Sequence, residues 1–229
     1  LKAAIRTARN AGGAVRARID GVQLSTQGRG SVLNTSSNVG PVSTYSGVLK
    51  PDLAAPGTDI LAAQIPDANS IGSLTGTSMA SPHVAGAAAL MLGANPSWTV
   101  DQVFSALLTS ATRNIVRSDL SPAFFFEGGA GQLDIPDAVR SGLHLRVTNA
   151  EFLAANPANG GDPTTLNLPS LHTRPCAPNC TFTRTVTANV GGTWTASASM
   201  ALGVAQVQPA SLQLAQGQSA TITITVTPP

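Results

Sequence analysis

One stretch of small residues constrains the fold of this chain more than any other feature. Residues 81–92 read SPHVAGAAALML, with Pro82 in the first helical turn, where proline is tolerated. Ala and Gly occupy nearly every side of the predicted helix, so it has no polar face for water. The stretch therefore predicts a buried helix that other backbone approaches closely.

The segments around this helix predict an α/β region. Residues 59–63 form a short apolar strand candidate after an Ala-Pro-Gly turn. Thr99 is placed to cap a second helix, with one apolar face, that ends near residue 110. A further helix is predicted over residues 134–141. These elements lie within residues 31–142, which we interpret as one unit.

Residues 143–229 have a different character, because charge almost vanishes and Thr, Val, Leu and Ser alternate. The alternation is strict at the start of residues 181–190, returns at 193–200 and is perfect over 221–227. Short strands with Gly and Pro between them predict a small all-β sandwich. Residues 155–165, rich in Asn, Gly and Pro, predict a loop or linker.

The composition excludes several classes of protein. The 229 residues are 42% hydrophobic and only 10% charged, the opposite of a disordered chain. The longest weakly polar run, residues 84–94, is far shorter than the ~20 residues that cross a bilayer, so no membrane span is expected. A net charge of +2 with scattered Lys and Arg argues against nucleic acid as a partner.

Residues 1–30 resemble neither of the longer regions. Residues 2–10 are amphipathic and precede an Ala-Gly-Gly stop, and residues 15–19 alternate like a short strand. The chain starts with Leu1 and shows no charged-then-apolar leader. We therefore expect a processed product or an excerpt of a longer polypeptide.

Cys176 and Cys180 lie close together in the run RPCAPNC at residues 174–180. Two local cysteines beside Pro and Asn suit a small disulfide loop in an oxidising compartment. The alternatives are two free thiols or half of a zinc site with His172 as a third ligand. A structural zinc site needs four ligands, and the sequence has no second cysteine pair, so the disulfide is favoured.

The segment GTSMASPHVAG at residues 76–86 carries the strongest functional signal. It predicts a turn that leads into the small-residue helix, with Ser78 at the helix N-terminus. Unpaired N–H groups and the positive end of the helix dipole lie there. A serine in that place can attack a carbonyl, and its own N–H can help to hold the oxyanion. The simpler alternative is that Thr77 or Ser78 only caps the helix.

The whole segment resembles the nucleophile motif of the subtilisin-like serine proteases, or subtilases. The resemblance extends to SSNVGP at residues 36–41, with one extra residue, and to LKPDLAAPGTDILAA at 49–63. It also covers GAGQLD at residues 129–134. The resemblance implies that residues 31–142 are the C-terminal part of a subtilisin-like, parallel-sheet α/β catalytic domain.

The C-terminal region is similar to one subfamily of subtilases. LNLPS at residues 166–170 and FTRTVT at 182–187 resemble the fibronectin-III-like domain of the cucumisin-like group. Residues 143–229 are then this small β-sandwich. In that group a protease-associated domain is inserted before the Ser-Ser loop, so residues 1–30 are expected to be the tail of such an insert or a linker.

The resemblance also assigns site residues. It implies that Ser78 is the nucleophile and an oxyanion donor, that Thr77 supports the oxyanion hole and that Met79 lines the site. His83 and the aspartates at positions 52 and 59 match structural positions of the family and receive no catalytic role. The family's catalytic Asp, its catalytic His and its oxyanion Asn precede this segment, so the chain alone is expected to be nearly inactive.

The implied partners are a protein or peptide substrate and the upstream part of the same polypeptide. The family and the disulfide imply a secreted protein, extracellular or periplasmic. Calcium is common in the family, but Asp162 stands alone and no set of 6–8 oxygen ligands is apparent. No cofactor or metal is therefore predicted.

Two other functions stay open at this point. An α/β-hydrolase esterase could take its acid from Asp119 or Asp134 and its base from His144 or His172, but Ala80 replaces the second glycine of the Gly-x-Ser-x-Gly elbow. The third possibility is an inert protease remnant whose β-sandwich binds a protein or a cell-surface polymer. Fold alone would not identify such a partner.

Overall fold

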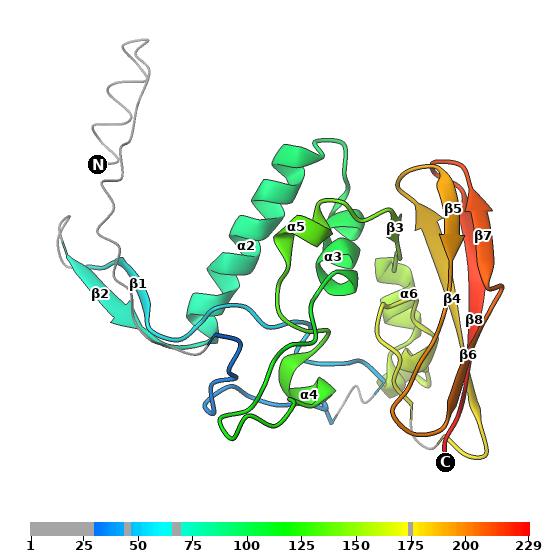
Figure 1. Cartoon of the computed structure of the whole chain (residues 1–229), viewed down its shortest axis with the longest axis horizontal. Helices are drawn as coiled ribbons and strands as arrows, with labels where there is room; N and C mark the ends of the chain where they lie inside the picture. The colour runs from blue at the N-terminus through cyan, green and yellow to red at the C-terminus, as the bar shows by residue number, and fades with distance from the viewer. Residues whose placement is uncertain (1–29, 44–46, 66–69, 174–175) are drawn as a thin grey trace, which may run out of the picture.

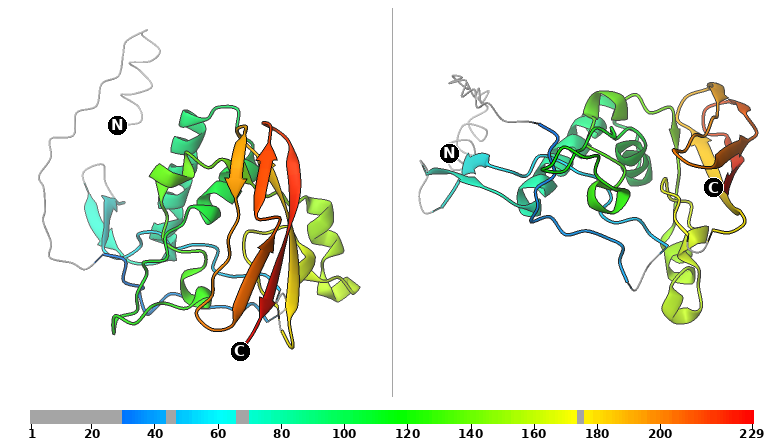
Figure 2. Two further views of the ribbon diagram at one scale, coloured as in Figure 1. Left: turned by 45° about the vertical axis from the view of Figure 1, so that its right-hand side comes forward. Right: turned by 60° about the horizontal axis from the view of Figure 1, so that its bottom comes forward.

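The computed structural model describes residues 30–43, 47–65, 70–173 and 176–229 (Figure 1). The helix and strand predicted within residues 2–19 lie outside these ranges. Figure 1 and the right-hand view of Figure 2 show α2 and α3 between the β1–β2 hairpin at one end and the C-terminal strands at the other. The mixture of helices and sheets agrees with the predicted α/β class for the first part of the chain.

Helix α2 spans Thr77–Ala94 and confirms the predicted helix, with Pro82 inside it. The prediction that it is buried is wrong for the described structure, where only Ala87 and Met91 are buried. A Cβ added at Gly86 or Gly93 would meet no atom within 4 Å. The reason is that α3 and α5 pack against one side of α2, while most of its other surface faces solvent.

Helix α3 spans Val100–Thr109 and begins at the predicted cap. The Thr99 side chain accepts from the Gln102 N–H, and the Gln102 side chain accepts from the Thr99 N–H, forming a capping box. The apolar face of α3 joins α2 and α5 in the first core. This core consists of Ala87, Met91, Val103, Ala106, Leu107 and Ala138.

The predicted strand at residues 59–63 appears as β1, Ile60–Ala63, and pairs antiparallel with β2, Ile71–Leu74. The resemblance implies only part of a parallel sheet in this chain, and among the described residues parallel pairing is limited to isolated bridges. At one of them Ala54 N–H donates to Gly131 O, and Ala54 O accepts from Leu133 N–H, both at 2.8 Å. Ala54 therefore ties the loop after Asp52 to the segment before α5 without extending into a strand.

Two short helices follow α3. Helix α4, Phe125–Gly128, was not predicted, and its start is held by Glu127, whose carboxylate accepts from the Phe124 N–H at 2.7 Å. Helix α5, Ile135–Ala138, is shorter than the predicted helix over 134–141. Asp134 caps α5 by accepting from the Asp137 N–H at 3.1 Å.

The C-terminal region contains mainly antiparallel strands, in agreement with the alternation in its sequence. A four-stranded sheet has the order β3-β4-β8-β6, and β5 pairs with β7 in a separate two-stranded sheet (Figures 1 and 2). The predicted loop at 155–165 contains η1, Pro157–Asn159, and η2, Pro163–Thr165, after the unpredicted helix α6, Asn149–Ala154. The strands are β3 Leu143–His144, β4 Cys180–Ala188, β5 Gly192–Thr195, β6 Val204–Gln208, β7 Ser211–Leu214 and β8 Ser219–Thr227.

Strand β4 buries every second residue, as its sequence predicts. Phe182, Val186 and Ala188 are buried, and so is Arg184, which is only 5% exposed. The guanidinium of Arg184 donates to the carbonyl oxygens of Leu168, Ser170 and its neighbour Thr183, at 2.7 to 2.8 Å. These bonds satisfy the buried charge and attach the segment before β4 to the sheet.

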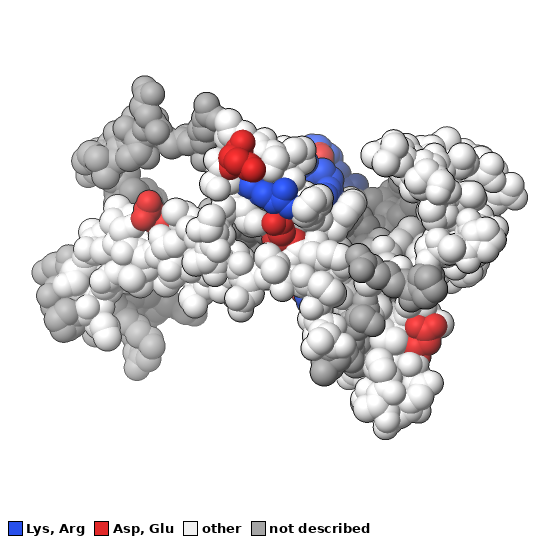
Figure 3. Space-filling view, turned by 90° about the horizontal axis from the view of Figure 1, so that it is seen from below, with Lys and Arg blue, Asp and Glu red and all other residues white. Residues whose placement is uncertain are grey.

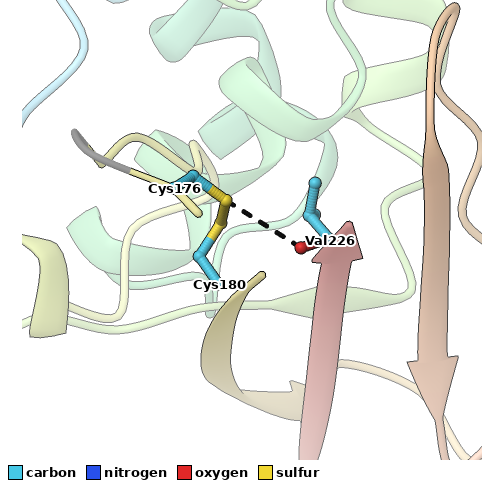
Figure 4. Close-up of a disulfide and its surroundings, with 3 residues drawn as sticks. All are labelled: Cys176, Cys180 and Val226. Atoms are coloured by element: carbon cyan, nitrogen blue, oxygen red, sulfur yellow. Dashed lines mark hydrogen bonds between the residues drawn. A yellow bond between two sulfur atoms is a disulfide. The ribbon is translucent and has the colours of Figure 1, made fainter. Parts of the chain in front are cut away.

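A disulfide joins Cys176 to Cys180, as predicted, and excludes both free thiols and a zinc ligand pair (Figure 4). The Cys176 Sγ lies 3.9 Å from the Val226 carbonyl oxygen on β8. A disulfide sulfur has no proton to donate, so this is a packing contact. The bond closes the short loop immediately before β4.

The surface reflects the low charge of the sequence. Charged side chains are sparse on the face shown in Figure 3. Among the described residues, no helix is both long enough and apolar enough to span a membrane.

Candidate active site

The N-terminus of α2 is a sharp turn held by backbone contacts. Gly76 precedes the helix, and its N–H donates to Gly57 O at 2.8 Å. The Gly76 carbonyl accepts from the N–H groups of Met79 and Ala80. No side chain caps this helix, so the alternative in which Thr77 or Ser78 serves as the cap is not what the structure shows.

Gly57 permits the close approach that forms this turn. A Cβ at position 57 would lie 2.8 Å from Gly76 O and 3.2 Å from the Ala80 Cβ. Any side chain there would push the loop away from the helix start. The Ala-Pro-Gly turn in the sequence is the signal for this contact, although it does not reveal the partner.

Ser78 is exposed in the first turn of α2. Neither its hydroxyl nor its backbone N–H, nor the N–H of Thr77, has a hydrogen-bond partner among the described residues. Free N–H groups at a helix N-terminus, with the helix dipole behind them, favour a negative charge. The site therefore combines an available hydroxyl with a donor suited to an oxyanion.

Ser78 and Thr77 lie in a groove of about 790 Å³. Its other walls are the loop around residues 30–42 and the segment around residues 50–58. Asn34 Nδ2 donates to Thr58 Oγ1 at 3.1 Å, which joins the two walls. Sequence reasoning found Ser78 but missed this wall contact. Met79 is partly buried, and its Sδ lies 3.9 Å from where a Gly76 Cβ would be.

The nearby titratable residues are held in other contacts. His83 Nδ1 lies 2.8 Å from the Met79 carbonyl of its own helix, so Nδ1 is the donor and the ring is fixed along α2. Asp59 accepts from the Thr75 hydroxyl at 3.3 Å, and its N–H donates to the same oxygen. Asp52 pairs with Lys50 at 2.6 Å. These contacts agree with structural roles for the three residues.

The acids of the esterase alternative are engaged away from Ser78. Asp119 accepts from both the hydroxyl and the N–H of Ser121, which together lower the pKa of its carboxyl. Asp134 caps α5. Neither is bonded to a histidine within the described part of the chain.

The two histidines of the esterase alternative are also held in other contacts. His144 lies in β3, and its Nδ1 is 2.7 Å from the Asn189 side-chain oxygen. His172 stacks edge-on against Phe126, with ring centroids 5.2 Å apart. The structure therefore does not assemble a Ser-Asp-His set from residues that follow Ser78.

Acidic, histidine and cysteine side chains do not gather at one point in the described part of the chain. No group of three or more His, Cys, Asp or Glu side chains among them could hold an ion. Asp162 serves as the cap of η2 and accepts from the N–H and hydroxyl of Thr164 at 2.9 and 2.8 Å.

Comparison with known proteins gives one consistent result. A family model described as "Subtilase family" matches residues 12–131, just over half of the chain. Subtilisin-like protease SBT4.4 of Arabidopsis thaliana is 36% identical over 142 residues, covering 57% of this chain and 19% of that protein. Subtilisin-like protease SBT4.3 of the same plant is 33% identical over 190 residues, covering 68% and 26%.

A third Arabidopsis thaliana relative, named CO(2)-response secreted protease, is 33% identical over 133 residues, covering 51% of this chain and 17% of that protein. The chain thus spans about a quarter or less of the length of these relatives.

Proposed function

Because this chain belongs to the subtilase family, we propose that it contributes the nucleophile Ser78 to a secreted serine endopeptidase. One observation carries the proposal. Ser78 stands in the first turn of α2, where its hydroxyl and N–H have no hydrogen-bond partner among the described residues, and it faces a groove large enough for a segment of polypeptide.

The reaction is acyl transfer. The Ser78 Oγ attacks the carbonyl carbon of a substrate peptide bond while a histidine accepts the hydroxyl proton. The carbonyl oxygen becomes negative and is stabilised by the Ser78 N–H and the helix dipole. The histidine then protonates the leaving amine, and water releases the acyl group from Ser78. Thr77 supports the oxyanion hole from the neighbouring position, and Met79 adjoins the nucleophile.

The histidine, its orienting aspartate and the second oxyanion donor come from the remaining polypeptide in this proposal. The length of the relatives supports it, because each is about four or more times longer than the segment it shares with this chain. The contacts of His83, Asp52 and Asp59 support it further, since all three are already committed elsewhere. The 229 residues alone are then nearly inactive.

The proposal divides the chain into parts with different tasks. Residues 31–142 are the C-terminal part of the catalytic domain, and residues 143–229 are a fibronectin-III-like β-sandwich that stabilises it. The end of the family match at residue 131 and the antiparallel sheets after residue 142 support this division. Residues 1–30 are the tail of an inserted domain or a linker.

Secretion is supported by the disulfide and by the name of one relative, CO(2)-response secreted protease. Disulfides persist in oxidising compartments.

A fluorophosphonate probe, which reacts with activated serines, tests the proposal. The full open reading frame should be labelled at Ser78, while the 229-residue chain should not. Ser78→Ala should abolish labelling and lower peptidase turnover by about 10⁶-fold, the loss known for subtilisin. Ser81→Ala is the matched control, because Ser81 is exposed on the same helix and should retain full labelling.

Two results would contradict the proposal. Labelling of the 229-residue chain alone would show that it contains its own base. Absence of labelling in both forms would favour an inert binding module.

A further inference from the structure

The loop closed by the disulfide carries a motif that the proposed protease chemistry does not use. Asn179-Cys180-Thr181 matches the pattern Asn-x-Ser/Thr, with x other than proline, that accepts N-linked sugar. We propose that Asn179 is N-glycosylated. The inference depends on the proposed secretion, because the modification takes place in the secretory pathway.

The structure presents this motif to solvent. Asn179 is exposed, and its side chain has no hydrogen-bond partner within the described ranges. The Cys176–Cys180 disulfide holds the loop immediately before β4. Thr181 is exposed and alternates with the buried Phe182, so the motif's hydroxyl lies on the outer side of the strand. A bulky glycan can therefore leave Asn179 without displacing packed side chains.

A second match to the same pattern, Asn34-Thr35-Ser36, is placed quite differently. Asn34 Oδ1 accepts from the N–H and the hydroxyl of Ser36, at 2.9 and 2.6 Å, and Nδ2 donates to Thr58. Asn34 also lines the groove that contains Ser78. A glycan at this position would disturb the wall and block substrate, so we assign the modification to Asn179 alone.

The transfer is a substitution at the anomeric carbon of the sugar. The Asn179 side-chain nitrogen attacks C1 of an oligosaccharide carried on a polyprenyl pyrophosphate. The new N–C1 bond forms as the bond from C1 to the pyrophosphate oxygen breaks, and the nitrogen loses one proton. The lipid pyrophosphate leaves, and no oxidation or reduction occurs.

The position of the glycan leaves the nucleophile accessible. β4 belongs to the C-terminal sheet, on the opposite side of α3 from α2 in Figure 1. Removal of the glycan is therefore expected to leave fluorophosphonate labelling of Ser78 unchanged. This separates the two proposals experimentally.

The test uses the full-length polypeptide, expressed in secreting eukaryotic cells behind a host leader so that it enters the secretory pathway. Peptide N-glycosidase converts a glycosylated asparagine to aspartate, and mass mapping of peptides should find this change at Asn179 and not at Asn34. Thr181→Val should abolish the modification, whereas Thr181→Ser, which keeps the motif, should retain it. Ser36→Ala should change nothing at Asn179.

A secreted protein with unmodified Asn179 would overturn the inference, and so would a glycan that persists in Thr181→Val. Labelling of Ser78 in the same sample reports the proposed function independently. Loss of labelling with an intact glycan would refute the nucleophile proposal and leave the glycosylation site standing.

Discussion

Helix α2 and strand β4 bury their apolar residues to very different degrees. α2 is built almost entirely from small and apolar residues, yet Leu90 is 61% exposed and Leu92 is 43% exposed. β4 alternates, and the apolar residues of one face are buried against the segments that precede it and the neighbouring strands. The buried face of β4 is therefore covered within this chain, whereas much of α2 is not.

This difference in burial indicates which neighbours each element needs. A helix without a polar face is stable only where other polypeptide covers it. The described residues cover one side of α2, through α3 and α5, and the relatives are several times longer than this chain. If this chain is part of a longer protease, as proposed, we expect the uncovered side of α2 to pack against the rest of that polypeptide. The described residues agree with this expectation, because none of them places a catalytic base beside Ser78.

The largest expected effect on stability comes from the covered side of α2. Met91 is fully buried in the first core, so Met91→Ala should lower the free energy of unfolding by about 2–5 kcal/mol through lost contacts and a cavity. Leu90→Ala, one residue away on an exposed face, should cost less than about 0.5 kcal/mol in this chain. Urea unfolding followed by circular dichroism measures both.

The same pair of variants tests whether the exposed side of α2 is covered by further polypeptide. In the full-length polypeptide the cost of Leu90→Ala should rise to a value close to that of Met91→Ala. An equally small effect of Leu90→Ala in both forms would show that this side of α2 is a true solvent face.

The second effect concerns the polar contacts that complete the C-terminal sheet. Arg184→Met keeps much of the side-chain volume but removes the donors for the carbonyl groups of Leu168 and Ser170. Leaving these acceptors without partners should cost about 2–3 kcal/mol of unfolding free energy. Arg184→Lys should recover only part of it, because one ammonium cannot reproduce the fork of the guanidinium. Equal stability of the Met and Lys variants would contradict the assigned bonds.

Local signals account for the elements that the sequence predicts correctly. The cap at Thr99, the strict alternation in residues 181–188 and the close cysteine pair each depend on neighbours within a few positions. The short helices α4 and α6 were missed because their capping glutamates lie in segments too short to show a period. Burial of Arg184 also escaped prediction, because carbonyl groups 14 and 16 positions away satisfy it.

The candidate site likewise has features that local sequence predicts and features that it does not. Ser78 was predicted at the start of a helix from adjacent residues, and the structure places it there. The contact between Gly57 and Gly76 and the bond between Asn34 and Thr58 bring together distant segments, so spacing could not reveal them. The exposure of α2 was mispredicted because composition indicates that a helix needs cover, but not whether the same chain supplies it.

The disulfide should give a smaller effect than the buried contacts. It closes a loop with a sequence separation of only 4, and the chain-entropy model gives about 2 kcal/mol for a ring of this size. Replacing both cysteines by serine should therefore destabilise the C-terminal sheet modestly and leave the first core unaffected. Hydrogen exchange measured separately for β4 and α3 would reveal this. Equal loss of protection in α3 would contradict a local effect and would show that it spreads through contacts such as the hydrogen bond from Gln102 Nε2 to Asn189 Oδ1.

The smallest expected effect concerns the pH dependence of stability. It compares Glu127 and Glu151, which hold equivalent helix N-termini, one in each region. The hydrogen bond from Arg117 and then the Phe124 N–H lower the pKa of Glu127, and the backbone and hydroxyl of Thr148 lower the pKa of Glu151. A carboxyl whose folded pKa lies below its ordinary value of 4.5 stabilises the protein above that value. This stabilisation is lost as the pH falls through the folded pKa.

Both Glu127→Gln and Glu151→Gln should therefore flatten the acid side of the stability profile, measured as unfolding free energy from about pH 7 to about pH 3. Glutamine can still accept from the N-cap N–H, so each variant isolates the contribution of the charge. Glu127→Gln should flatten the profile more, because only Glu127 also bonds a guanidinium, at 2.9 Å. An equal change in the two variants would show that the caps, and not the Arg117 pair, set the acid sensitivity of the first region.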